Sequence, residues 1–144
     1  MKPIQLVYVA GPYRGDSMWH VTRNIEAARE VGAKIAEARW PNGDHIAYPL
    51  IPHTNTGGMD GVADDDFWLA GTMAMMRACK AVVMMPTWRR SSGARAEHAE
   101  AFRLGMPVLD LLDHVDPSTH RQSIEDWLRL VLRDIEMQSD LLTL

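Results

Sequence analysis

The chain has 144 residues, of which 47% are apolar and 24% charged, so it can form one globular domain with its own core. Its net charge of -4 argues against a polynucleotide-binding surface, although a local group of arginines could still hold one phosphate. A single cysteine excludes an intrachain disulfide, and no apolar run reaches membrane-spanning length, so we expect a cytoplasmic protein with neither a signal peptide nor a membrane anchor.

The first part of the sequence predicts two strands and a helix. Residues 4–10 form a near-continuous apolar run of β-prone residues, typical of a strand buried on both faces, and Gly11-Pro-Tyr-Arg-Gly15 ends it. Apolar residues then recur at helical spacing over residues 21–39. After a turn, residues 45–50 predict a second short strand. The segment 51–61 is rich in Pro, Gly, Asn and Thr, which predicts a loop able to act as a lid.

The second part predicts three helices and two strands. Three aspartates open a helix over residues 64–78, because acidic side chains favour a helix N-terminus. Residues 81–85 are apolar and closed by a proline, which favours a strand over a helix. The helix that follows ends at Gly105, residues 106–112 predict a fourth strand, and about residues 123–138 predict a last helix.

This alternation of strands and helices predicts a single α/β domain over residues 1–144. We expect a three-layer sandwich with a mainly parallel, Rossmann-like (flavodoxin-like) sheet. Right-handed crossovers would place the loops after the first and third strands at the same sheet edge, where ligands bind in open α/β folds. No internal repeat or linker is evident in the sequence.

The turn after the third strand predicts an anion site. Ser91, Ser92 and Gly93 supply a helix N-cap and a backbone that a ligand can approach closely. Free N–H groups and the helix dipole would point into this turn.

Glu97 is the unusual residue of the helix that begins there. It shares a face with small or apolar residues, namely Gly93, Ala94, Ala101 and Leu104. We expect the helix dipole to help keep its carboxylate ionised, which makes it a candidate nucleophile or base in a dry cleft. Ala99 and Phe102 form a second apolar face, so either face could meet the pocket.

Several other kinds of site lack their motifs. The sequence contains no Gly-x-Gly-x-x-Gly dinucleotide fingerprint, no P-loop and no Gly-x-Ser-x-Gly elbow. Six scattered histidines and one cysteine argue against zinc. We therefore expect neither a metal nor a cofactor. The kind of site that remains possible is a carboxylate beside an anion site.

Three stretches carry a family resemblance: Tyr8-Val-Ala-Gly-Pro-Tyr-Arg-Gly15, Ser91-Ser-Gly-Ala-Arg-Ala-Glu97 and Ala101-Phe-Arg-Leu-Gly-Met-Pro-Val108. They resemble the nucleoside 2-deoxyribosyltransferase superfamily, and in particular its DUF4406-like branch, over roughly residues 4–112. The superfamily contains transferases that exchange bases on deoxyribose, and 2'-deoxynucleoside 5'-phosphate N-hydrolases. The motifs here are closest to those of the hydrolases.

The resemblance implies that Glu97 is the nucleophile and that a 5'-phosphate is bound. Transferases tend to have aspartate six residues before the glutamate and hydrolases serine, which is Ser91 here. The hydrolase pattern Tyr-x-x-Gly-x-x-Arg-Gly is reproduced by Tyr8, Gly11, Arg14 and Gly15. The phosphate-binding residues implied are Arg14, Gly15, Ser91 and Gly93. This also fits the chemistry, because serine, arginine and helix N–H groups accept a phosphate dianion that a carboxylate would repel.

The resemblance also implies that an aspartate acts as the acid that supports the departing base. Asp65, three residues before Trp68, is the first choice here, with Asp64 and Asp66 as alternatives. Five residues are candidates for binding the rest of the substrate: Tyr8, Gly11, Tyr13, His53 and Trp88. The aromatic ones could border a base, but core or turn packing explains Tyr8, Tyr13, His53 and Trp88 nearly as well.

The implied function is hydrolysis of the base–sugar bond of (deoxy)nucleoside 5'-monophosphates through a covalent glycosyl-glutamate intermediate. The alternatives are a deoxyribosyltransferase and a non-catalytic nucleotide-sensing module. The expected partner is a nucleotide or nucleoside, not a membrane or a polynucleotide.

The last predicted helix carries an apolar stripe: Ile124, Trp127, Leu128, Val131 and Ile135. Together with the resemblance, this stripe predicts a homodimer or larger homo-oligomer. The alternative is a helix that packs on its own domain.

Overall fold

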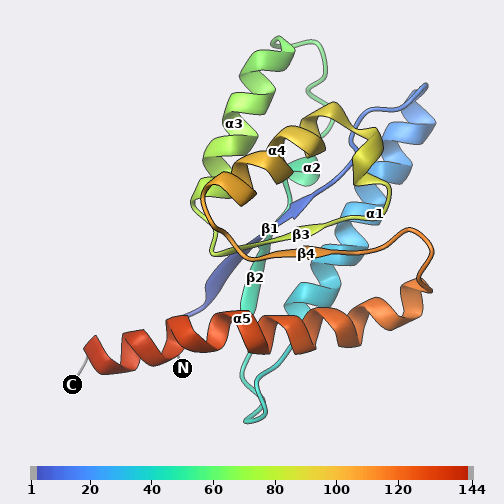
Figure 1. Ribbon diagram of the computed structural model, residues 1–144. Helices are drawn as coiled ribbons and strands as arrows, with labels where there is room; N and C mark the ends of the chain where they lie inside the picture. Colours follow the sequence, from blue (N-terminus) through green and yellow to red (C-terminus); the bar gives the residue numbers. More distant parts are fainter. Residues whose placement is uncertain (1–2, 143–144) are drawn as a thin grey trace.

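A four-stranded parallel sheet between two layers of helices forms the domain in the computed structural model (Figure 1). The strand order is β2-β1-β3-β4, and each neighbouring pair is parallel. This confirms the predicted three-layer α/β sandwich, and the order agrees with the flavodoxin-like arrangement. The structure describes residues 3–142, with side chains up to residue 133.

The sheet is built around its two central strands. The strands are β1 (Gln5–Ala10), β2 (Ala47–Leu50), β3 (Ala81–Met84) and β4 (Val108–Asp110). All of β3 and the last four residues of β1 are buried, because helices cover both faces of the sheet. The edge strands are shorter than the predicted ranges 45–50 and 106–112. His45, for example, forms only an isolated bridge with Arg39.

Five helices and two short 3-10 turns accompany the strands in the described part of the chain. They are α1 (Met18–Glu37), α2 (Pro52–Asn55), α3 (Asp65–Arg77), η1 (Trp88–Arg90), α4 (Ser92–Arg103), η2 (Pro117–Thr119) and α5 (His120–Leu142). Helices α1 and α5 cover one face of the sheet, and α3 and α4 cover the other (Figure 1). Among the described residues, no helix is both long enough and apolar enough to span a membrane.

Some helix boundaries differ from the prediction for local reasons. Helix α1 begins earlier because Ser17 accepts a hydrogen bond from the backbone of His20 and so acts as its N-cap. The predicted loop 51–61 contains the short helix α2, which has Pro52 in its first turn. The last helix begins at His120, directly after η2.

Helix α5 packs on its own domain over the described side chains. Ile124, Leu128 and Leu132 are buried in one cluster with residues of α1 and the sheet. Leu130 is 71% exposed. Ile135, the last residue of the predicted stripe, lies outside the described side chains. Much of the stripe therefore contributes to the core of the chain itself.

Truncating a buried residue of α5 should destabilise the domain far more than truncating an exposed one. Leu128→Ala should lower the free energy of unfolding by about 2–5 kcal/mol, because it leaves a cavity in the core. Leu130→Ala should change it by no more than about 0.5 kcal/mol. Urea unfolding monitored by circular dichroism measures both values. Equal effects would show that α5 is not part of the core.

Candidate functional site

The loops after β1 and β3 meet at the carboxyl edge of the sheet. The Met85 N–H donates to the Ala10 carbonyl at 2.7 Å. At Gly11, an added Cβ atom would lie 2.6 Å from the Cβ atom of Met85, which is too close for any side chain. Glycine is therefore required where the first loop passes the end of β3. This edge is where open α/β folds bind ligands.

Glu97 lies at this edge, on the buried side of α4. Its side chain is only 6% exposed, and Ala94 and Ala101 are buried on the same face. Phe102 is 80% exposed, so the alternative apolar face points to solvent. The hydroxyl of Tyr8, fully buried on β1, donates a hydrogen bond to Glu97 Oε2. The carboxyl group is thus held between strand β1 and helix α4.

Burial changes the acidity of this carboxyl group. Desolvation raises the pKa of Glu97 to about 7, while the hydrogen bond from Tyr8 acts in the opposite direction. We expected the helix dipole to help keep Glu97 ionised, and burial acts against that charge. Burial, and then the nearby Glu97 charge, raise the pKa of Tyr8 as well. A carboxyl group with this pKa exchanges its proton near neutral pH.

The N-terminus of α4 is capped and accessible. Ser91 Oγ accepts a hydrogen bond of 3.2 Å from the N–H of Ala94. An added Cβ atom at Gly93 would find only Ser91 Oγ, at 4.0 Å, so space remains in front of this first turn. Ser91 and Gly93 thus occupy the positions that the sequence predicted for them, at a helix end that favours anions.

Trp88 is buried beside this helix end rather than open to the site. Its ring stacks on His98 at 4.3 Å between centroids, and its indole N–H donates to Asp110 at 3.0 Å. The guanidinium group of Arg89 lies 4.6 Å from the ring centroid. In this structure Trp88 packs the turn after β3, as the alternative interpretation expects.

The same turn contains a strained residue that the sequence analysis missed. Thr87 has a φ of 68°, in the left-handed region that β-branched residues rarely adopt. Its N–H donates to the Asp113 carboxylate at 2.6 Å. The local sequence does not predict this conformation of Thr87, because its hydrogen-bond partner Asp113 lies after β4.

The first loop contacts the start of α3 and the segment before it. Arg14 is exposed and forms an ion pair with Asp65, and the Tyr13 hydroxyl donates to Asp60. Asp64 acts as the N-cap of α3, accepting from the N–H of Phe67 at 2.9 Å. The structure therefore brings Asp65, and not Asp64, to the predicted phosphate-binding arginine.

His53 supports the first loop from α2. It is 3% exposed, and its Nε2 atom lies 2.9 Å from the Pro12 carbonyl oxygen. Its ring centroid is 6.1 Å from that of Tyr13. Burial lowers the pKa of His53, which favours the neutral ring.

Six of the predicted site residues thus form three groups: Tyr8 with Glu97, Arg14 with Asp65, and Tyr13 with His53. In the part of the chain with described side chains, no hydrogen bond or ion pair joins one group to another. Nor do these residues contain a cluster of three or more His, Cys, Asp or Glu suited to a metal ion.

A protein-family model matches most of the chain. The family described as a domain of unknown function, DUF4406, matches residues 5–110. The chain belongs to the DUF4406 family. The match runs from β1 to β4, so all three groups of site residues lie inside it, whereas α5 lies outside. No curated protein matches the chain.

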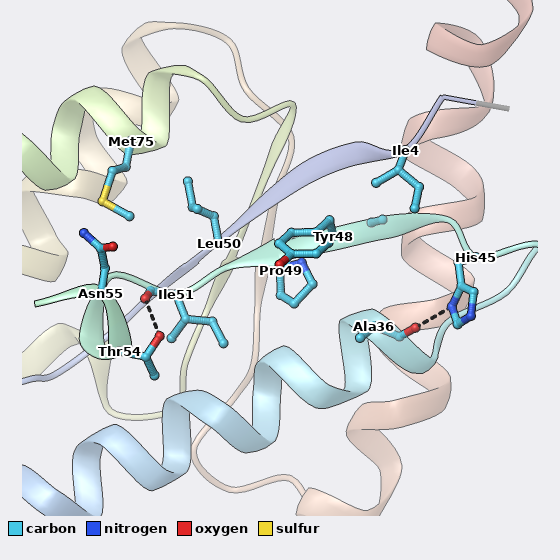
Figure 2. A pocket seen from close by; sticks show the side chains of 11 residues that line it. Ile4, Ala36, His45, Tyr48, Pro49, Leu50, Ile51, Thr54, Asn55 and Met75 are labelled. Atoms are coloured by element: carbon cyan, nitrogen blue, oxygen red, sulfur yellow. Dashed lines mark hydrogen bonds between the residues drawn. The ribbon is translucent and has the colours of Figure 1, made fainter. Parts of the chain in front are cut away.

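A pocket of about 740 Å³ lies elsewhere on this DUF4406 protein, along the outer edge of β2 (Figure 2). Tyr48, Pro49 and Leu50 of β2 line it, with Ile4 at one end and Met75 of α3 at the other. Thr54 and His45 border it, but each already has a hydrogen bond to a backbone carbonyl, of Ile51 and Ala36 respectively. None of the predicted site residues lines this pocket, so we place the candidate site at Glu97.

The pKa of Glu97 predicts how stability depends on pH. The folded protein raises this pKa from the ordinary 4.5 to about 7, so it favours the neutral acid. The contribution of the Glu97 carboxyl group to the free energy of unfolding is therefore fully present below pH 4.5. It is lost as the pH rises through 7. Glu97→Gln keeps an acceptor for Tyr8 without a charge. This variant should therefore be more stable than the wild type at pH 8, by up to roughly 3 kcal/mol, and not at pH 4.

Urea unfolding at the two pH values tests this expectation. The control is Glu100→Gln on the same helix, because Arg103 lowers the pKa of Glu100 and its charge is therefore favourable. The control should gain nothing at pH 8. A Glu97→Gln variant without any gain at pH 8 would mean that the carboxyl group is not desolvated.

Proposed function

We propose that this DUF4406 protein belongs to the nucleoside 2-deoxyribosyltransferase superfamily and hydrolyses the base–sugar bond of (deoxy)nucleoside 5'-monophosphates. The observation that supports this most is the Glu97 carboxyl group, buried at the carboxyl edge of the sheet and hydrogen-bonded to Tyr8. A carboxylate with little water around it is a strong nucleophile when a cationic centre develops in front of it. The type of reaction is inferred from the three sequence motifs that resemble those of the superfamily.

The proposed reaction has two steps. In the first, an oxygen of ionised Glu97 bonds to the anomeric carbon while the carbon–nitrogen bond breaks, and the departing base takes its electron pair and a proton from Asp65. In the second, Asp65 removes a proton from a water molecule that attacks the anomeric carbon. The ester bond breaks and Glu97 regains its carboxylate. Tyr8 keeps the carboxyl group oriented between the two steps.

The ion pair between Arg14 and Asp65 gives the substrate phosphate a role in releasing Asp65. Both side chains are largely exposed, at 69% and 71%, so their attraction is weak. A phosphate dianion would compete well for Arg14, and Asp65 would then be released near the substrate. The structure favours Asp65 over Asp64 for the proton transfer, because Asp64 already caps α3. Ser91, Gly93 and Gly15 complete the proposed phosphate site.

Two further features belong to the proposal. A cytoplasmic location fits the single free cysteine, Cys79, which is buried. The homo-oligomer expected from the superfamily stays a prediction, since α5 uses much of its apolar stripe within the chain.

Glu97→Gln should abolish turnover while nucleotide binding is retained. We expect kcat to fall by at least ~10³-fold, because the nucleophile is lost and the shape is kept. Glu100→Gln is the control and should keep most of the activity, since Glu100 pairs with Arg77 and Arg103 and not with Tyr8. The measurement is chromatography of released base from a panel of nucleosides and nucleoside 5'-monophosphates, with and without added free base.

The panel separates the alternatives. Release from monophosphates alone supports the hydrolase, and base exchange on nucleosides would instead indicate the transferase. Nucleotide binding with neither reaction would indicate a sensing module. Normal turnover by Glu97→Gln would mean that another group is the nucleophile.

A further inference from the structure

Helix α4 is held at two neighbouring residues by two different parts of the chain. At Glu97, the hydroxyl of Tyr8 on β1 donates a hydrogen bond to the carboxyl group. At the next residue, the ring of His98 stacks on the indole ring of Trp88, with 4.3 Å between the centroids and 18° between the planes. Trp88 lies in the turn after β3, so the two contacts reach α4 from different strands.

The two contacts hold α4 in different directions around its axis. Successive residues of an α-helix are about 100° apart around that axis. A helix held at one residue can still roll about it, whereas contacts at both Glu97 and His98 fix its rotation. The face that α4 presents to Tyr8 therefore depends on where Trp88 holds His98.

The Trp88 ring is itself fixed by a carboxylate at the end of β4. Asp110 accepts from the indole N–H at 3.0 Å through one oxygen, and from the Arg89 guanidinium group at 2.5 Å through the other. That guanidinium group lies 4.6 Å from the Trp88 ring centroid, within the range of a cation–π interaction. Trp88 also packs in the same buried cluster as Tyr8. The ring therefore cannot shift without breaking contacts with β4 and with the core.

The backbone on both sides of Trp88 is fixed as well. The N–H of Thr87 donates to Asp113 at 2.6 Å, which holds this residue in its left-handed conformation. The N–H of Ser91, the N-cap of α4, donates to the Trp88 carbonyl at 3.0 Å. Strained backbone conformations persist only where the surroundings hold them, and they gather at functional sites. Here the strained residue directly precedes the ring on which α4 rests.

We infer that His98 is a positioning residue for Glu97. By stacking on Trp88, it sets the rotation of α4 at which the Glu97 carboxyl group meets the Tyr8 hydroxyl. The importance of this placement for catalysis rests on the proposed function, whereas the placement itself does not. His98 was not among the predicted site residues, because helical spacing puts it about a quarter-turn away from Glu97. Its stacking partner lies before the helix, and the sequence does not predict that contact.

A pair of substitutions at His98 tests this role by ¹³C NMR titration of the Glu97 carboxyl group. His98→Ala removes the ring, so α4 should roll and water should reach the carboxyl group. The midpoint should then fall from about pH 7 towards 4.5, by about one pH unit or more, because burial is the main cause of the raised pKa. His98→Phe keeps a ring that can stack and should leave the midpoint unchanged. Phe102→Ala, which removes an exposed ring from the same helix, is the control and should also leave it unchanged.

Turnover should follow the placement of Glu97. We expect His98→Ala to lower kcat for base release from nucleoside 5'-monophosphates about 10-fold or more, with KM nearly unchanged, because the nucleophile is misdirected while the groups that bind substrate remain. His98→Phe and Phe102→Ala should keep most of the wild-type kcat. A wild-type midpoint and kcat in His98→Ala, or equal losses in His98→Phe, would overturn the proposal.

Urea unfolding distinguishes a purely structural role. A lower free energy of unfolding in His98→Ala, with the Glu97 midpoint unchanged in the folded protein, would show that the stack only stabilises the domain and would overturn the proposal. If His98→Ala does not fold, His98→Gln takes its place with the same expected results, since it also lacks the ring. The Glu97 midpoint requires no substrate. It therefore decides about the positioning role even if the wild-type protein releases no base, a result that would remove the proposed function alone.

Discussion

The candidate site depends on one buried hydrogen bond, from the hydroxyl of Tyr8 to the carboxyl group of Glu97. It joins the central strand β1 to helix α4, although the two residues lie far apart in the sequence. Both side chains are almost inaccessible to water, so the carboxyl group loses hydration that a single hydroxyl only partly replaces. The raised pKa of Glu97, and the reactivity that we propose for it, both follow from this desolvation.

The polar groups around this centre separate into a buried pair and an exposed pair. Glu97 and Tyr8 are buried under α4, while Arg14 and Asp65 are largely exposed. A substrate with an apolar or neutral reacting centre and a charged end fits such a division, because a phosphate can remain partly hydrated while the glycosidic carbon is dehydrated.

Much of the fold could be predicted because its signals are local. β1 and β3 are continuous apolar runs, which only a sheet covered on both faces accommodates. The acidic start of α3 and the serine cap of α4 were recognisable from residue type and position. The sequence left two faces of α4 as candidates for its buried side. In the structure the buried face is the one that carries Glu97.

The remaining features depend on partners distant in the sequence. The ends of β2 and β4 are set by pairing with central strands, so their own residues define them poorly. The conformation of Thr87 depends on Asp113, and the pairing of Arg14 with Asp65 depends on how α3 packs. The raised pKa of Glu97 could not be read from its position in the helix, because it follows from burial by the whole fold.

The most direct measurement is a ¹³C NMR titration of the Glu97 side-chain carboxyl group in the wild-type protein. We expect a midpoint at about pH 7, as burial requires. We also expect Tyr8→Phe to move the midpoint higher, because it removes the hydrogen bond that favours the carboxylate. A midpoint near the ordinary value of 4.5, unchanged in Tyr8→Phe, would show a hydrated carboxyl group and would refute the central role that we assign to this pair.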